Sequence, residues 1–154
     1  SLDRKVVIAD DPTTALDVIV QAQILKKIKE IQQKRNLSMI LITHDLSIIA
    51  NVCNRVAVMY AGKIVESGPV KAIFKNPMHP YTKGLLNSVP SLEGDKRDLV
   101  SIPGSPPDLT NPPLGCSFSP RCTCNKERCV KEEPCMCEVE AQHLVACHLT
   151  HSGK

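Results

Sequence analysis

The chain of 154 residues has a formal net charge of +3 at pH 7 and contains only four aromatic residues. It offers neither the basic surface nor the stacking side chains that nucleic-acid binding needs. None of its apolar runs approaches the roughly 20 residues of a membrane-spanning helix. It opens with Ser1-Leu2-Asp3 and shows no signal peptide, so we expect a cytoplasmic protein that meets a membrane only through a partner.

The first part of the sequence predicts a parallel β-α-β unit. Residues 6–9 are a short apolar run that ends at charged residues and a proline, as a buried strand does. Apolar residues recur at helical spacing between Ile19 and Ile31, and residues 39–42 form a second apolar run. A strand, a helix and a strand in this order make a right-handed crossover, so the two strands should be parallel.

The next part predicts short elements and then a long connector. We expect a short helix, the two strands of a hairpin that turns at Ala61-Gly62, and two further short helices, at residues 46–53, 55–60, 63–66, 70–74 and 81–88. Repeated prolines mark residues 90–113 as an extended connector. Seven of the eight cysteines follow, among few large apolar residues, so this tail should need a metal or disulfides to fold.

Asp10, Asp11 and His44 follow the two predicted parallel strands. Ligands of open α/β sheets bind at the carboxyl ends of parallel strands. Taken alone, however, an aspartate at a strand end is more often a capping carboxylate than a magnesium ligand. The position of these residues therefore leaves both interpretations open.

The longer strings VIADDPTTALD (residues 7–17) and LITHD (residues 41–45) together resemble ABC-transporter ATPases. The resemblance implies that the first string is the Walker B strand with the D-loop, and that the second carries the switch histidine. ATP and Mg²⁺ are then the expected ligands. Asp10 would hold Mg²⁺ through water, because this ion dehydrates reluctantly. Asp11 stands where the family usually has the Glu that polarises the attacking water. His44 would sense the γ-phosphate, and Asp17 ends the loop that touches the opposite nucleotide-binding domain.

The phosphate-binding loop of such ATPases lies outside this sequence. A loop of the form GxxxxGKS or GxxxxGKT needs closely spaced glycines, and the first glycine here is Gly62. The family places that loop, and a glycine-containing signature motif, before the Walker B strand. We therefore expect this chain alone to be inactive as an ATPase. We also expect residues 1–90 in isolation to be poorly soluble, because apolar faces and strand edges would stay uncovered.

The string NPMHPYTKGLL (residues 76–86) resembles the HPYT segment of oligopeptide and dipeptide importer ATPases, and IPGSPPD (102–108) and GCSFSPRC (115–122) extend the resemblance into the tail. This implies an energy-coupling ATP-binding subunit of a peptide importer at the cytoplasmic face of the membrane; nickel or an opine-like solute stays open. The implied partners are a second ATPase subunit, identical or different, transmembrane permease subunits and, indirectly, a solute-binding protein. The alternative is a truncated, non-catalytic metal-binding or interaction module, or a gene remnant.

Four cysteines in the tail match the spacing in these importer ATPases: Cys116, Cys122, Cys129 and Cys147. The resemblance implies that their thiolates hold a 4Fe–4S cluster, and Zn²⁺ is the alternative, because four thiolates suit either. The surplus Cys124, Cys135 and Cys137 are left as alternative ligands, free thiols or a second site. Cys53, on a predicted helix, is interpreted as a small core residue.

The expected fold class is α/β. An incomplete ABC ATPase nucleotide-binding domain, with a partial parallel sheet and helices, should be followed by a small, irregular, Cys-rich tail. The expected divisions are residues 1–75 for the nucleotide-binding part, 76–113 for the family-specific extension and connector, and 114–150 for the metal-binding tail.

Overall fold

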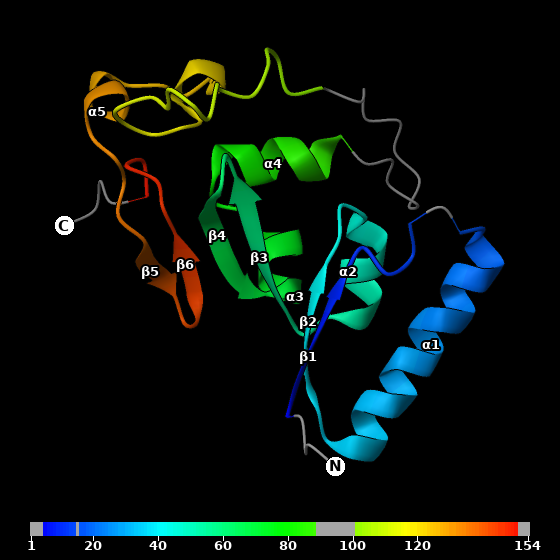
Figure 1. Ribbon diagram of the computed structural model, residues 1–154. Coiled ribbons are helices and arrows are strands. Elements are labelled where there is room, and N and C mark those ends of the chain that lie inside the picture. Colours follow the sequence, from blue (N-terminus) through cyan, green and yellow to red (C-terminus); the bar gives the residue numbers. More distant parts are fainter. Residues whose placement is uncertain (1–4, 15, 89–100, 151–154) are drawn as a thin grey trace. The chain divides into compact units, whose positions relative to one another are not determined.

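The computed structural model describes residues 5–14, 16–88 and 101–150. They belong to two compact units, residues 1–53 and 54–154, and each unit has its own sheet (Figure 1). The mixed α/β class is as predicted. The predicted boundaries at residues 75 and 113 both fall inside the second unit, and the three-part division stays a prediction. No helix in the described part of the chain is both long enough and apolar enough to span a membrane.

The first unit is a β-α-β unit followed by a short helix. Strands β1 (Val6–Asp10) and β2 (Ser38–Ile42) are parallel, with Asp10 opposite Ile42, so the predicted pairing is confirmed. Helix α1 (Val18–Arg35) connects them and α2 (Leu46–Val52) follows (Figure 1). One face of both strands is uncovered, because alternate apolar side chains are half or more exposed, namely Val6, Ile8, Ile40 and Ile42.

Helix α1 begins and ends where its capping residues stand. The Asp17 carboxylate accepts hydrogen bonds from the backbone N–H groups of Ile19 and Val20, at 3.0 and 2.9 Å, and so satisfies two donors of the first turn. At the other end Asn36 takes a left-handed conformation, with φ 48°, and its N–H bonds back to the last turn. These caps turn the chain back into β2.

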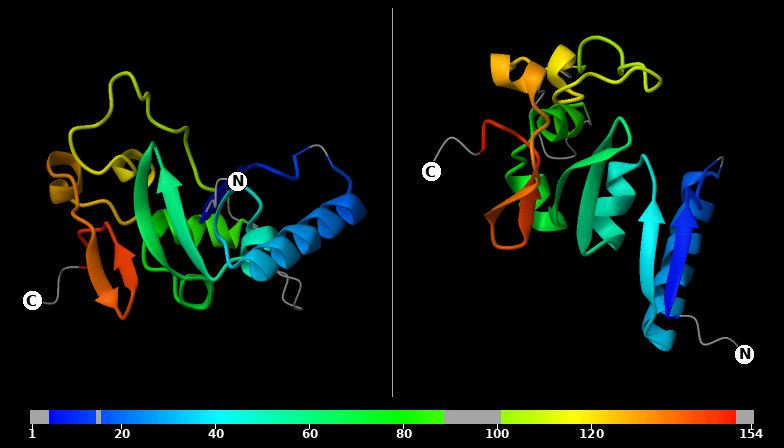
Figure 2. Two further views of the ribbon diagram at one scale, coloured as in Figure 1. Left: turned by 60° about the horizontal axis from the view of Figure 1, so that its bottom comes forward. Right: turned by 60° about the vertical axis from the view of Figure 1, so that its left-hand side comes forward.

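The second unit is built on a four-stranded antiparallel sheet. Strands β3 (Arg55–Tyr60) and β4 (Lys63–Pro69) form the predicted hairpin, with positive φ at both Ala61 and Gly62, as a tight two-residue turn requires. Strands β5 (Cys137–Glu140) and β6 (His143–Val145) extend this sheet in the order β3-β4-β6-β5 (Figure 2). The remaining elements are α3 (Val70–Lys75), α4 (Pro80–Asn87), the 3-10 turn η1 (Ser119–Arg121) and α5 (Glu127–Lys131).

An aromatic cluster forms the core of the second unit. Tyr60 of β3, Tyr81 of α4 and Phe118 lie with ring centroids 4.7 to 5.5 Å apart. Arg121 closes one side, because its guanidinium donates to the carbonyl oxygens of Ile102 and Pro103 and lies 5.8 Å from the Tyr60 ring centroid. The cluster joins the hairpin, the HPYT helix and the cysteine-rich tail.

The expectation of an irregular tail needs correction. Residues 114–150 contain η1, α5, β5 and β6, and they bury Phe118, Val145 and Ala146. The tail supplies two strands to a shared sheet and one ring to the shared aromatic core. Its apolar residues are too few for a separate core, and they are buried against β3, β4 and α4 instead.

Candidate functional site

The ends of β1 and β2 bring two of the predicted catalytic residues together. The N–H of Asp11 donates to the carbonyl of Ile42 at 2.9 Å, which extends the parallel pairing by one residue. Just beyond, Nδ1 of His44 lies 3.3 Å from Oδ1 of Asp11. Both side chains are accessible, with 82% of His44 and 43% of Asp11 exposed, so a ligand could reach them from solvent.

The turn after β1 gives Asp11 an unusual backbone. Its φ is 40°, a left-handed conformation that aspartate tolerates better than most residues. The carbonyl of Asp11 accepts from the N–H of Thr14 at 3.1 Å, which closes the turn. Asp10, immediately before, ends β1 and is exposed. The two carboxylates therefore sit at the carboxyl edge of the parallel pair, where the sequence predicts them.

Two other aspartates near this edge, Asp17 and Asp45, cap helices. The Asp17 carboxylate is engaged as the α1 cap. Asp45, which the sequence analysis did not single out, caps α2 by accepting from the N–H and hydroxyl of Ser47 and also lies 3.3 Å from Nε2 of Gln21. These hydrogen bonds, that of the Ser47 side chain first, lower the pKa of Asp45. An Asp two residues before a Ser at a helix start is the local signal for such a cap.

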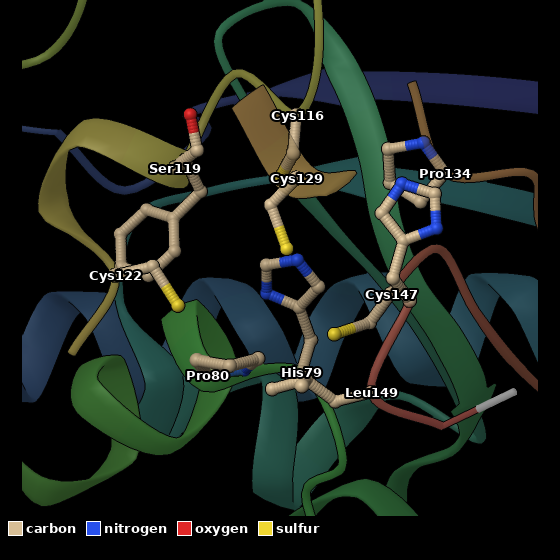
Figure 3. A pocket seen from close by; sticks show the side chains of 11 residues that line it. His79, Pro80, Cys116, Ser119, Cys122, Cys129, Pro134, Cys147 and Leu149 are labelled. Carbon is tan, nitrogen blue, oxygen red and sulfur yellow. The ribbon is translucent and has the colours of Figure 1, made fainter. Parts of the chain in front are cut away.

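In the second unit the four predicted cysteines line one small cavity. Cys116, Cys122, Cys129 and Cys147 all border it, together with His79 of the HPYT segment. Figure 3 shows these cysteines around the imidazole ring of His79. The cysteines come from separate places: the loop before η1, the end of η1, α5 and the residues after β6. The open space between them is about 10 Å³, which holds one water molecule.

The backbone around this cavity is closely fitted. The N–H of Cys116 donates to the carbonyl of Cys129 at 2.8 Å. A Cβ on the preceding Gly115 would lie 2.3 Å from that same carbonyl oxygen, closer than any real contact. Only glycine therefore allows the two cysteine-bearing segments to approach this closely.

Burial and backbone hydrogen bonds have opposite effects on the pKa of three of these cysteines. Burial raises the pKa of Cys116, Cys122 and Cys147, and neighbouring cysteines raise it further. Against this, backbone hydrogen bonds from residues two or three positions further along lower the pKa of each, from Phe118 and Ser119, Cys124, and Leu149 and Thr150 respectively. Such N–H donors stabilise sulfur-bound negative charge, which suits thiolates that ligate a metal.

Four thiols are suitable ligands for a metal–thiolate centre. In this structure, however, their sulfurs are not arranged to bind a single metal ion. Among the residues described, no three His, Cys, Asp or Glu side chains are grouped to hold a metal ion. A tetrahedral Zn²⁺ with Zn–S bonds of about 2.3 Å needs sulfurs about 3.8 Å apart. A cubane cluster needs them farther apart, because each thiolate binds a different iron, and a 10 Å³ space requires the side chains to move outward first.

A buried polar network supports the cavity from the β4 side. The Glu66 carboxyl, fully buried, accepts from the N–H groups of Met78 and His79 at 2.8 and 3.0 Å and lies 2.7 Å from Nε2 of His143. Nδ1 of His79 in turn accepts from the N–H of Tyr81 at 3.0 Å. Burial lowers the pKa of His79 to about 4, although Glu66 opposes this. Sequence reasoning missed Glu66 and His143, because they are 77 positions apart.

The matches to known proteins together cover both units of the chain. Residues 65–129 match the family model of the oligopeptide/dipeptide transporter C-terminal region. The chain is 53% identical to the oligopeptide transport ATP-binding protein OppD of Bacillus subtilis, over 96% of this chain and 41% of that protein. It is 54% identical to the dipeptide transport ATP-binding protein DppD of the same organism, over 94% of this chain and 43% of that protein.

A third relative covers almost all of the chain. The dipeptide transport ATP-binding protein DppD of Caldanaerobacter subterraneus subsp. tengcongensis is 44% identical over 99% of this chain and 47% of that protein. The chain thus spans less than half the length of the curated relatives it matches. The chain is thus similar to oligopeptide and dipeptide transport ATP-binding proteins, and it matches their carboxy-terminal region.

Proposed function

We propose that this chain is part of the energy-coupling ATPase subunit of an importer for dipeptides or oligopeptides. The observation that carries the proposal is the contact between Asp11 and His44 at the ends of two parallel strands, in a chain that matches peptide-transport ATP-binding proteins. The importer's ligands are ATP and Mg²⁺. Its partners are a second ATPase subunit, permease subunits in the membrane and a solute-binding protein, and the subunit acts at the cytoplasmic face.

Each residue at the strand ends has a separate task in this proposal. Asp10 would hold Mg²⁺, which would neutralise charge on the ATP phosphates. Asp11 accepts a hydrogen bond from the water that attacks the γ-phosphate, and His44, 3.3 Å from it, orients that water and the phosphate. Asp17 ends the segment that faces the second ATPase subunit, and its carboxylate holds the start of α1 in place.

Transport by the complete protein tests this assignment. In membrane vesicles with the whole importer, His44→Ala is expected to lower ATP-driven peptide uptake and ATP hydrolysis by about 100-fold while ATP binding persists, because positioning of the reacting groups is lost. Lys34→Ala, an exposed change at the far end of α1, serves as the control and should leave both rates unchanged. Full activity in the His44 variant would contradict the role given to this residue.

The cysteine cavity is proposed to hold a metal–thiolate centre. Four thiols on one cavity support this, and so do the backbone hydrogen bonds that lower the pKa of three of them. A 4Fe–4S cluster is the first candidate and Zn²⁺ the second; either would supply a structural cross-link between the η1 loop, α5 and the end of β6. Cys116, Cys122, Cys129 and Cys147 would be the ligands.

Metal analysis distinguishes these candidates. Protein purified without oxygen is expected to contain iron and acid-labile sulfide, and Cys129→Ser should lose both, since this buried thiol has no substitute in the cavity. Cys53→Ser, in the first unit, is the control and should retain them. Stoichiometric zinc without iron or sulfide would show that the centre is a zinc site and not a cluster. Protein without any metal would contradict the proposed centre.

A further inference from the structure

Two cysteines outside the cavity form a close pair. Cys135 and Cys137 flank Met136 in the segment that leads from α5 into β5, and neither lines the cavity of the four other cysteines. Their Sγ atoms are 3.2 Å apart. Alternate residues of an extended segment carry their side chains on the same side, which brings the two thiols together.

The pair is accessible and partly held. Cys135 is exposed and Cys137 is half-buried. Cys137 is the first residue of β5 and pairs with Val145 of β6, so the strand fixes its backbone. Cys135 precedes the strand and follows a proline. A disulfide has an S–S bond of about 2.05 Å, so the sulfurs need to approach by only about 1 Å, which rotation of the exposed Cys135 side chain supplies.

Cys135 and Cys137 have different environments and therefore different roles. The hydrogen bond with Cys135 raises the pKa of Cys137, followed by smaller effects of burial and of charge on Cys135. Either thiol can donate in this pair, and a hydrogen bond that raises the pKa of Cys137 stabilises its protonated form. Arg128 also interacts with Cys135: the pKa of Arg128 is raised, first by its hydrogen bond with Glu132 and to a lesser degree by Cys135. Cys135, the more exposed of the two, is the thiol that a small molecule reaches first.

We propose that Cys135 and Cys137 form a reversible dithiol–disulfide site that exchanges with small-molecule disulfides such as oxidised glutathione. The Cys135 thiolate attacks one sulfur of the small disulfide, so that a mixed disulfide forms and one small thiolate leaves. Cys137 then loses its proton to solvent and attacks the Cys135 sulfur, which releases the second small thiolate. The protein dithiol is oxidised by two electrons, and the small disulfide is reduced to two thiols.

Peptide mapping of the full chain tests this site without reference to transport or to the metal centre. The reduced protein is treated with oxidised glutathione, its remaining thiols are alkylated, and it is cleaved after acidic residues. Cleavage after Glu132 and Glu138 gives a peptide, residues 133–138, whose only cysteines are Cys135 and Cys137. In the wild type this peptide is expected to lose two hydrogens and to carry neither glutathione nor alkyl groups.

Two variants make the test decisive. Cys137→Ser should trap a stable glutathione adduct on Cys135, because the resolving thiol is gone. Cys124→Ser changes another exposed cysteine and should behave as the wild type does. A wild-type peptide that carries glutathione, or that stays fully alkylated at concentrations which modify Cys124, would overturn the proposal.

Discussion

Replacing Glu66 with alanine is expected to destabilise the second unit by about 3–5 kcal/mol, the cost of removing one partner from a buried polar pair. The change leaves the N–H groups of Met78 and His79 and the ring of His143 without their carboxyl partner in a fully buried position. Hydrogen exchange of the β4 and β6 amides in the complete protein measures the loss. Faster exchange should extend to the HPYT segment, because Glu66 holds its backbone.

A surface glutamate gives the matched control. Glu133 lies 2.6 Å from Nζ of Lys63, and both side chains are about half exposed. Glu133→Ala should therefore cost less than about 1 kcal/mol. Glu66→Gln should fall between the two, because the amide keeps one acceptor oxygen but turns an NH₂ group toward a backbone donor. Equal exchange rates for Glu66→Ala and Glu133→Ala would show that the buried network does not stabilise the unit.

Exchanging Asp11 for glutamate is expected to raise ATP turnover of the complete protein, by up to about 100-fold, since a catalytic group misplaced by 1 Å can cost that much. Aspartate is one methylene shorter than the Glu that the family usually has at this position. The carboxylate of Asp11 stands 3.3 Å from the His44 ring, and the longer side chain would carry it further toward the ligand side. Turnover at saturating MgATP measures the effect.

The Asp11→Glu exchange also lowers stability, because of the backbone conformation at this position. Asp11 has φ 40°, where aspartate is tolerated and glutamate costs about 1 kcal/mol more. The Asp11→Glu protein should therefore be faster but slightly less stable. Glu30→Asp on α1 changes a side chain by the same methylene away from the strand ends and should leave turnover unaltered. Unchanged or lower turnover in Asp11→Glu would show that Asp11 already places the water well.

Local sequence signals were sufficient for the elements of the first unit and for the hairpin. The β-α-β order, the parallel pairing and the turn at Ala61-Gly62 follow from apolar periodicity and from residues that tolerate positive φ. The positions of Asp11 and His44 at one sheet edge follow from the same pattern. Their chemical roles came from the resemblance, because an aspartate at a strand end is ambiguous by itself.

Contacts between residues that are far apart in the sequence could not be predicted from it. Residues 114–150 contain too few large apolar side chains to indicate a core, and the sequence does not reveal that Phe118 packs on Tyr60 or that β6 pairs with β4. The Glu66–His143 contact joins two segments with no shared motif. That these four cysteines would come together was expected only from the family resemblance, and their spacing alone does not choose between a cluster and zinc.

The coding sequence immediately upstream of the Ser1 codon tests the central claim most directly. If the chain is the carboxy-terminal region of a working transport ATPase, an in-frame stretch there should encode GxxxxGKS or GxxxxGKT, followed by a glycine-rich signature motif before Asp10. A stop codon or unrelated sequence at that place would contradict the proposed catalytic role and favour a non-catalytic module that acts through its cysteines.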